Sequence, residues 1–187
     1  HLLGQIVNHY QAPDDAGCDF AELLEAVDAL PGVRRIRFAS PHPRHVSARL
    51  IAAMRVLSVV CKHLHLPVQS GSTRILVEAV KAGVPGIQLS TDMIVGFPGE
   101  TAADFEETLS MVQAVGFHSM FSFKYSERPG TLAAKRMPDD VPEEEKERRL
   151  SALQELQKGI QSALHERAIG QTFEVLVDSV SRRRETE

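Results

Sequence analysis

The chain has 187 residues, of which 43% are hydrophobic and 25% charged, and its formal net charge at pH 7 is −4. This size and apolar content allow one domain with a substantial core and part of a second. A negative net charge argues against a surface that binds nucleic acid everywhere, although a local basic patch is compatible with it. The sequence has neither a signal peptide nor an apolar run near the ~18 residues that span a bilayer, so we expect a cytoplasmic protein without a membrane partner.

The two cysteines, Cys18 and Cys61, lie far apart in the sequence. They form no C-x-x-C pair and indicate no disulfide framework of the kind that small secreted proteins use. Cys18 lies in a turn-like stretch, and Cys61 ends an apolar run. We interpret them as a loop thiol and a small buried hydrophobic residue, without a metal or catalytic role.

Short apolar runs alternate with helical stretches, which favours successive βα units and a parallel sheet. Strands are expected at Leu2–Val7, Val33–Ala39, Lys62–Val68, Ile87–Val95, Phe117–Tyr125 and Phe173–Val177. Helices are expected from Asp19 to Leu30, Ser47 to Leu57, Thr73 to about Lys81, Thr101 through Val115, and Pro142 to Gly170. The segment Ser126–Val141 is expected to be a long loop.

Start signals support two of these helices in particular. Thr101 and Asp104 match the capping box, in which a hydroxyl residue and an acidic residue three positions later bond each other's backbone N–H groups. Pro142 fits the first turn of the last helix, and the run Glu143–Glu145 suits its positive end.

Four or five βα units without internal repeats fit either a βα barrel or a doubly wound sheet, and periodicity does not choose between them. In both folds, ligands gather at the carboxyl ends of the strands. Small or polar residues fall there in this chain: Gly4, Gln5 and Asn8; Ser40; Gln69–Ser72; Asp92, Gly96 and Glu100; and Ser126–Arg128. Amide, hydroxyl and backbone groups suit binding of a polar cofactor better than nucleophilic catalysis.

Histidines and arginines allow two further interpretations. His63 and His65 alternate along a strand and therefore face the same side, but no third ligand completes a metal set, so we interpret them as a packed or hydrogen-bonded pair. The run Arg182–Arg184 can be a solvated turn or a phosphate contact.

Five groups of segments, in this order, resemble the radical S-adenosylmethionine methylthiotransferases. They are Leu2–Asn8, Arg35–Phe38 with Ser40–Pro43, His63–Ser72, Ser90–Thr101, and Phe121–Ser126 with Arg128–Thr131. Within the family they look most like the MiaB-type branch, which methylthiolates C2 of an isopentenylated adenosine beside the tRNA anticodon. The branch that acts on threonylcarbamoyladenosine in tRNA shares the Gln69–Ser72 segment and is the nearer alternative.

The resemblance implies an α/β fold, with a partial βα barrel of the radical S-adenosylmethionine type over residues 1–169 and the start of a TRAM domain, a small RNA-binding β-barrel, over 170–187. It implies a transferase that uses S-adenosylmethionine and two [4Fe–4S] clusters, with tRNA as partner and an unidentified sulfur donor; we expect a monomer. By similarity, the cofactor-binding residues are Gly4, Gln5, Ser40, Gln69, Ser70, Asp92, Gly96 and Arg128. The RNA-binding residues are Arg182, Arg183 and Arg184.

The chain departs from the family at three places. The N-terminal domain and the C-x-x-x-C-x-x-C loop would precede His1, so the sequence provides no cluster ligand, and we expect the chain alone to be inactive. The family usually has an additional helix between Ser72 and Ser90, and Ile6 stands where asparagine is common. A non-catalytic βα domain that binds RNA or a protein remains the alternative from another class, and an ordinary barrel lyase or hydrolase is disfavoured by the lack of an acid–base pair.

Overall fold

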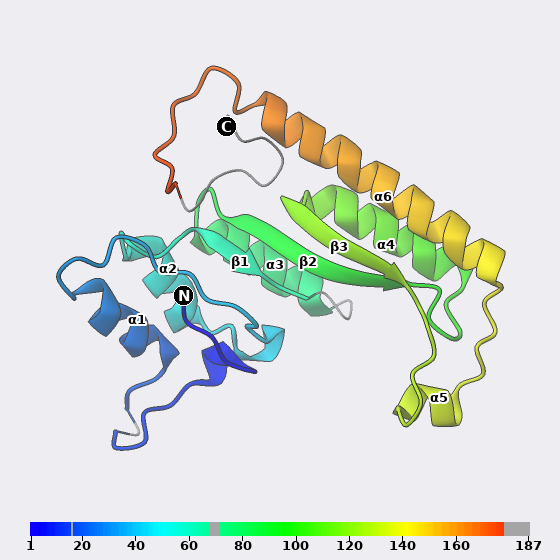
Figure 1. Ribbon diagram of the computed structural model, residues 1–187, viewed down its shortest axis with the longest axis horizontal. Coiled ribbons are helices and arrows are strands. Elements are labelled where there is room, and N and C mark those ends of the chain that lie inside the picture. The colour runs from blue at the N-terminus through cyan, green and yellow to red at the C-terminus, as the bar shows by residue number, and fades with distance from the viewer. Residues whose placement is uncertain (16, 68–71, 178–187) are drawn as a thin grey trace.

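The computed structural model describes residues 1–15, 17–67 and 72–177 and shows an α/β arrangement with a parallel sheet (Figure 1). The strands are β1 (His63–His65), β2 (Gln88–Val95) and β3 (Ser119–Lys124). The α-helices are α1 (Phe20–Asp28), α2 (Ala48–Val56), α3 (Ser72–Gly83), α4 (Ala102–Val115), α5 (Leu132–Arg136) and α6 (Glu143–Glu166). Two 3₁₀-helices, η1 (Val7–His9) and η2 (Pro43–His45), lie in the first third of the chain.

The strands pair in the order in which they occur in the chain. β1 and β3 flank β2, both parallel to it, with Leu64 opposite Leu89 and Asp92 opposite Phe121. Two isolated parallel bridges precede them, Leu2 with Phe38 and Ile36 with Val60. Each successive βα segment is thus added on the same side of the last, which is compatible with a partial βα fold.

The first two predicted strands are much shorter than expected. Leu2–Val7 takes part in one isolated bridge and Val33–Ala39 in two. Each bridge is held by two backbone hydrogen bonds, such as Ile36 N–H to Val59 O at 2.7 Å and Cys61 N–H to Ile36 O at 3.0 Å. The reason lies after Gly4, where Gln5 and Ile6 turn the chain and His9 N–H bonds Ile6 O at 3.0 Å in a 3₁₀ pattern. Local turn bonds replace the ladder.

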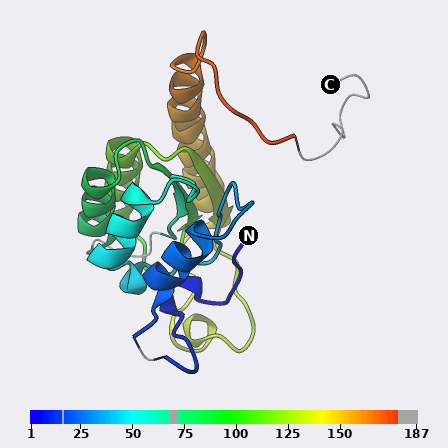
Figure 2. The same ribbon diagram turned by 90° about the vertical axis from the view of Figure 1, so that its left-hand side faces the viewer.

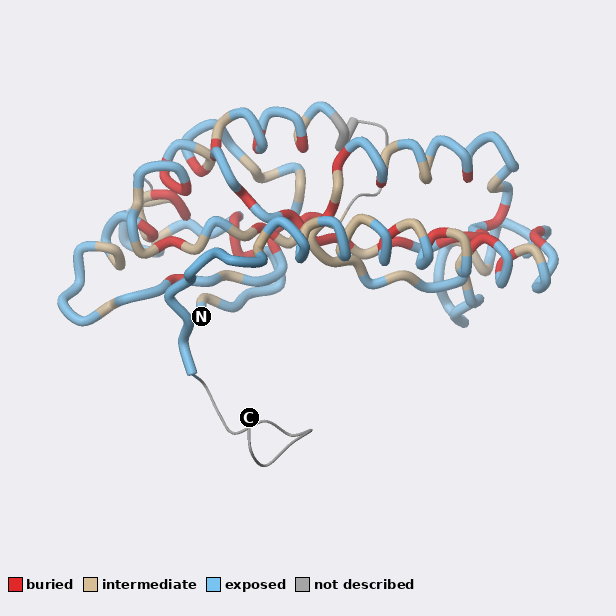
Figure 3. Tube along the Cα trace, turned by 90° about the horizontal axis from the view of Figure 1, so that it is seen from above, coloured by how far each residue is buried: buried red, intermediate tan, exposed pale blue. Residues whose placement is uncertain are grey.

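One face of the sheet carries the core. Figures 1 and 2 show α2, α3 and α4 on the same side of the strands, with α6 along β3. Leu64, Leu89 and Val95 of the strands join Val80 of α3 and Phe105 of α4 in one buried cluster. In Figure 3 the buried residues gather between sheet and helices, while the outer helix faces are exposed. This pattern is what an amphipathic helix layer on a sheet requires.

The helix starts were predicted well. Asp19 accepts from the backbone N–H groups of Ala21 and Glu22, and Ser47 caps α2. The reciprocal capping box of Thr101 and Asp104 is present at α4.

Two expectations about the loop and the C-terminal part were wrong. The long loop contains α5, whose first turn is capped by Thr131, so a hydroxyl cap before Leu132 was the missed signal. Phe173–Val177 forms no strand; its residues are exposed, and Glu174 O accepts from Arg35 at 3.0 Å. Among the described residues no strand pairs with this segment, and its apolar side chains are exposed.

Candidate functional site

The face of the sheet opposite the helices is open, and it becomes more exposed toward the carboxyl ends of the strands. Along β2, Ser90 is 4% exposed, the Asp92 side chain 46% and Ile94 58%. Side chains two residues apart share a face, so these three lie in a row. The intervening Thr91, Met93 and Val95 are buried on the helix side.

A chain of hydrogen bonds crosses from β1 to β2 on this open face. His63 Nε2 lies 3.3 Å from Ser90 Oγ, and Ser90 Oγ lies 3.0 Å from His65 Nδ1. His65 Nε2 in turn lies 3.3 Å from Asp92 Oδ2. The interpretation of His63 and His65 as a packed or hydrogen-bonded pair is therefore confirmed in its second form, with Ser90 as the link that the sequence did not reveal.

Burial lowers the pKa of His63 below its ordinary value, and the nearby positive charge of Arg37 lowers it further, with smaller effects from His118 and His65. A neutral imidazole at this position can both donate and accept a hydrogen bond.

Large apolar side chains lie next to Asp92, toward the carboxyl ends of the strands. Phe121 is opposite Asp92 and Phe123 opposite Ile94 in the register, and the three apolar residues are 55–64% exposed. At the strand ends Phe97 and Tyr125 make an edge-to-face pair at 5.0 Å. A polar half and an apolar half thus adjoin on one surface. We call Ile94, Phe121 and Phe123 the apolar platform.

The turn after β2 is locked by α6. Gly96 has a positive φ of 70°, and its N–H donates to the carboxylate of Glu100. Arg149, whose side chain is 6% exposed, donates to Glu100 Oε2 at 2.7 Å and to Glu145 Oε1 at 2.8 Å. Gly96 and Glu100 thus connect the end of β2 to α6.

Lys146 of α6 also packs against the turn after β2. Its side chain is 4% exposed, its Nζ lies 2.6 Å from Asp139 Oδ2, and it stands 5.4 Å over the Tyr125 ring. The burial of Lys146 and Arg149 could not be predicted, because both lie in a run of charged residues that is typical of an exposed helix.

The first two loops lie side by side at the start of the chain. Asn8 Oδ1 accepts from His42 N–H at 2.8 Å, and Asn8 Nδ2 donates to His42 O at 3.0 Å. Val7 N–H bonds Ser40 O, which brings the loops of Gly4, Gln5 and Ser40 together. Ser40 has a φ of 57°, a conformation rare outside glycine. His9 stacks on His45 at 4.2 Å.

Those predicted site residues that the structure describes lie at three places. Gly4, Gln5 and Ser40 lie together, exposed, in the first two loops, and Asp92 and Gly96 lie on and after β2. Arg128 is exposed after β3, and its carbonyl accepts from the Thr131 hydroxyl at 2.9 Å. Gln69, Ser70 and Arg182–Arg184 lie outside the described residues.

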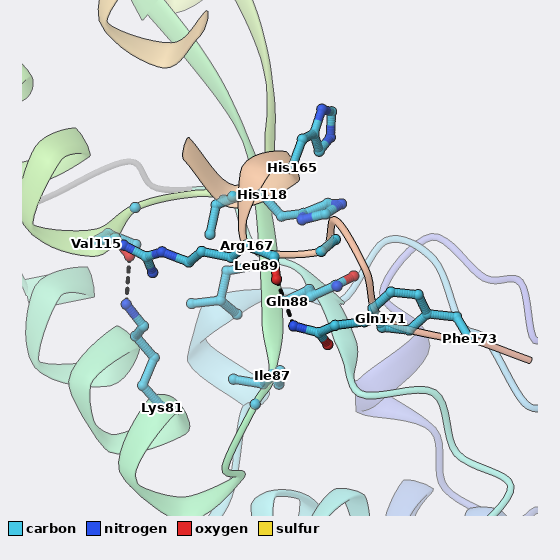
Figure 4. Close-up of a pocket in the computed structure, with 14 residues that line it drawn as sticks. Lys81, Ile87, Gln88, Leu89, Val115, His118, His165, Arg167, Gln171 and Phe173 are labelled. Carbon is cyan, nitrogen blue, oxygen red and sulfur yellow. Dashed lines mark hydrogen bonds between the residues drawn. The ribbon is translucent and has the colours of Figure 1, made fainter. Parts of the chain in front are cut away.

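A hollow of about 530 Å³ lies at the opposite end of the sheet, where β2 begins. Figure 4 shows Lys81, His118, His165 and Arg167 around it, with Lys81 donating to Val115 O. Its position away from the carboxyl ends separates it from the open-face site.

Within the described ranges, no group of three histidine, cysteine, aspartate or glutamate side chains can hold a metal ion. Cys18 and Cys61 are both free. The same part of the chain contains no helix with the length and apolar content needed to cross a bilayer.

Comparison with known proteins finds many whose sequences are similar to this chain. Proteins named tRNA-2-methylthio-N(6)-dimethylallyladenosine synthase from Chlorobium limicola, Solibacter usitatus and Moorella thermoacetica are 48%, 46% and 46% identical to it. The matches cover 97%, 95% and 97% of this chain. The chain is a homologue of these synthases. The resemblance seen in its sequence is thereby confirmed.

The homologous region is only part of each synthase. The chain spans 43–44% of the length of these relatives, so it matches less than half of each. No family model matches the chain.

Proposed function

We propose that the chain is the part of a tRNA methylthiotransferase that binds S-adenosylmethionine and the modified adenosine. The observation that carries the proposal is the 44–48% identity to tRNA-2-methylthio-N(6)-dimethylallyladenosine synthases. The parent enzyme would add a methylthio group to C2 of N6-isopentenyladenosine next to the anticodon. Such a protein would work as a monomer in the cytoplasm, where tRNA is found.

The proposed fold is a partial radical S-adenosylmethionine barrel over residues 1–169, followed by the beginning of a TRAM domain. The sequential parallel pairing from Leu2 to β3 supports the first part. Residues Arg182–Arg184 would contact tRNA phosphates.

The open face suits an adenine nucleoside, a group that S-adenosylmethionine and the modified adenosine share. Asp92 offers carboxylate oxygens to hydroxyl or amino donors, and the adjacent apolar platform can pack against a planar ring. Gly4, Gln5, Ser40, Gln69, Ser70, Gly96 and Arg128 would complete the cofactor-binding edge. When bound, one S-adenosylmethionine molecule would supply the radical and a second one the methyl group.

The residues of this chain do not fit an iron–sulfur cluster. Such a cluster is held by three or four cysteine thiolates, and the chain has two cysteines on separate segments. Cluster ligands would come from elsewhere in the parent protein. The chain itself would bind and orient the nucleoside and exclude water from its apolar side.

The names of the relatives favour dimethylallyladenosine over threonylcarbamoyladenosine as substrate. The apolar platform agrees with this choice, because a prenyl group is apolar whereas a threonyl group carries a carboxylate.

Mass spectrometry of tRNA nucleosides tests the proposal. A strain that lacks the full parent gene should accumulate N6-dimethylallyladenosine without its 2-methylthio derivative, and the restored gene should return the modified nucleoside. Loss of the methylthio group from threonylcarbamoyladenosine would favour the other branch. Unchanged nucleosides would favour a non-catalytic binding domain.

A further inference from the structure

When His63 and His65 are both neutral, the hydrogen-bond chain on the open face has one consistent direction. As a carboxylate, Asp92 can only accept, so His65 Nε2 must carry the hydrogen at the 3.3 Å contact. Neutral His65 then presents a lone pair at Nδ1, to which the Ser90 hydroxyl donates. The Ser90 oxygen is left to accept from His63 Nε2.

This direction fixes the tautomer of both histidines without any metal ion. It requires His63 and His65 to carry hydrogen on Nε2 when neutral. The groups whose charges act on His63 are Arg37, His118 and His65, and burial together with these neighbours favours its neutral form. Ser90 is buried between the two rings and cannot exchange its partners for water easily.

We propose that His63, Ser90 and His65 are positioning residues for Asp92, and that Asp92 accepts an N–H or O–H group of a nucleoside whose ring packs on the apolar platform. The His65 contact holds one carboxylate oxygen and so aims the half-exposed carboxylate across the open face. The inference rests on the proposed function only in its choice of a nucleoside as ligand.

The hydrogen-bond chain predicts communication over two strands. A change at Asp92 alters the hydrogen bond of His65, then that of Ser90, and finally that of His63. If the side chains were not hydrogen-bonded to one another, a substitution at Asp92 would leave the His63 ring unchanged, because the surroundings of each ring would be independent.

Imidazole ¹⁵N NMR of the 187-residue chain near pH 7.5 tests the direction. We expect the Nε2–H tautomer at His63 and His65, and a shift of the His63 resonances in Asp92→Asn. That shift should vanish when Ser90→Ala is combined with Asp92→Asn. Ser119→Ala is the matched control, because Ser119 is the partner of Ser90 on the other neighbouring strand and lies outside the hydrogen-bond chain. An Nδ1–H tautomer at His65, or a His63 response that survives Ser90→Ala, overturns the inference.

Titration with N6-dimethylallyladenosine, followed by the same resonances, tests the ligand. Loss of a hydrogen bond to a charged group should weaken binding by about tenfold or more in Asp92→Asn. A smaller loss of affinity is expected in Ser90→Ala and none in Ser119→Ala, with thermal melts to confirm that all variants are folded. Equal affinity in all variants, or no binding to the unmodified chain, overturns the inference. The tRNA nucleoside measurement is independent of these outcomes and reports on the proposed function separately.

Discussion

At the scale of single residues, Gly96 shows how the end of β2 is built. Its φ of 70° is disfavoured for residues with a Cβ atom, and a Cβ there would overlap the Lys146 side chain. Gly86 has a similar φ of 76°, but no atom lies within 4 Å of its Cβ position. Both glycines therefore have a positive φ, but only at Gly96 would an added Cβ atom meet a neighbouring side chain.

Gly96→Ala should therefore destabilise the chain more than Gly86→Ala. The left-handed conformation costs about 1–2 kcal/mol in both variants, and overpacking against Lys146 should add roughly 1–3 kcal/mol at Gly96. Urea unfolding measures the two free energies. Equal losses would show that Lys146 moves aside without cost.

Histidines should make the fold sensitive to mild acid. Burial is the largest cause of the lowered pKa of both His63 and His45. The unfolded chain then binds more protons than the folded one just below the ordinary pKa of 6.5, so stability falls as the pH drops through that value and levels off above it.

The free energy of unfolding should accordingly decrease between pH 7.5 and pH 5.5. His63→Gln, which keeps a donor near the Nε2 position, should reduce this decrease, because one of the two groups no longer titrates. Urea unfolding at several pH values measures the slope. An unchanged slope in His63→Gln would contradict the prediction.

The sequence predicted part of this residue-level chemistry. Alternation placed His63 and His65 on one face, and the lack of a third metal ligand favoured a packed or hydrogen-bonded pair. The link through Ser90 could not be predicted, because it depends on the register between β1 and β2, which is a tertiary property.

At the scale of elements, α6 fastens the turn after β2 through Arg149. The guanidinium and the Glu100 carboxylate are both largely buried, whereas the neighbouring Arg148 is 61% exposed and pairs with Glu145 on the surface. The Arg149–Glu100 ion pair is therefore shielded from water, whereas the Arg148–Glu145 pair is solvated.

Arg149→Leu should cost about 3–5 kcal/mol of stability, because it leaves the Glu100 carboxylate buried without its partner. Arg148→Leu should cost about 0–1 kcal/mol, as expected of an exposed pair. Thermal or urea unfolding of both variants makes the comparison. Similar losses would mean that water reaches Glu100 once Arg149 is removed.

Among the elements, local signals were the most reliable guides. Asp19, Ser47 and the Thr101 capping box start helices where they were expected, since caps act within four residues of sequence. Strand lengths were less predictable, because the hydrogen bonds between strands depend on partners far away in the chain. The Leu2–Val7 run, for example, forms one bridge and then continues as a 3₁₀-helix.

At the scale of the whole molecule, the chain by itself should hold no stable [4Fe–4S] cluster. Its two cysteines cannot provide the ligand set that such clusters use. Iron quantification after anaerobic reconstitution checks this. A brown, stoichiometric and cysteine-dependent cluster would contradict the prediction.

The parallel direction of the strands could be predicted from the alternation of elements, but their order and the open face could not. Phe121 and Phe123 alternate with Ser122 and Lys124, a pattern that would place the two rings on a buried face. These rings are exposed because α2, α3 and α4 all lie on the other face of the sheet. No local sequence pattern indicates on which face the helices pack.

The apolar platform also determines how the isolated chain should behave in solution. Ile94, Phe121 and Phe123 form a contiguous exposed surface on β2 and β3, and such surfaces promote self-association. Sulfate salts strengthen apolar association, so they should drive the chain into oligomers before they precipitate it. A ligand that covers these three side chains would therefore act as a solubilising agent as well.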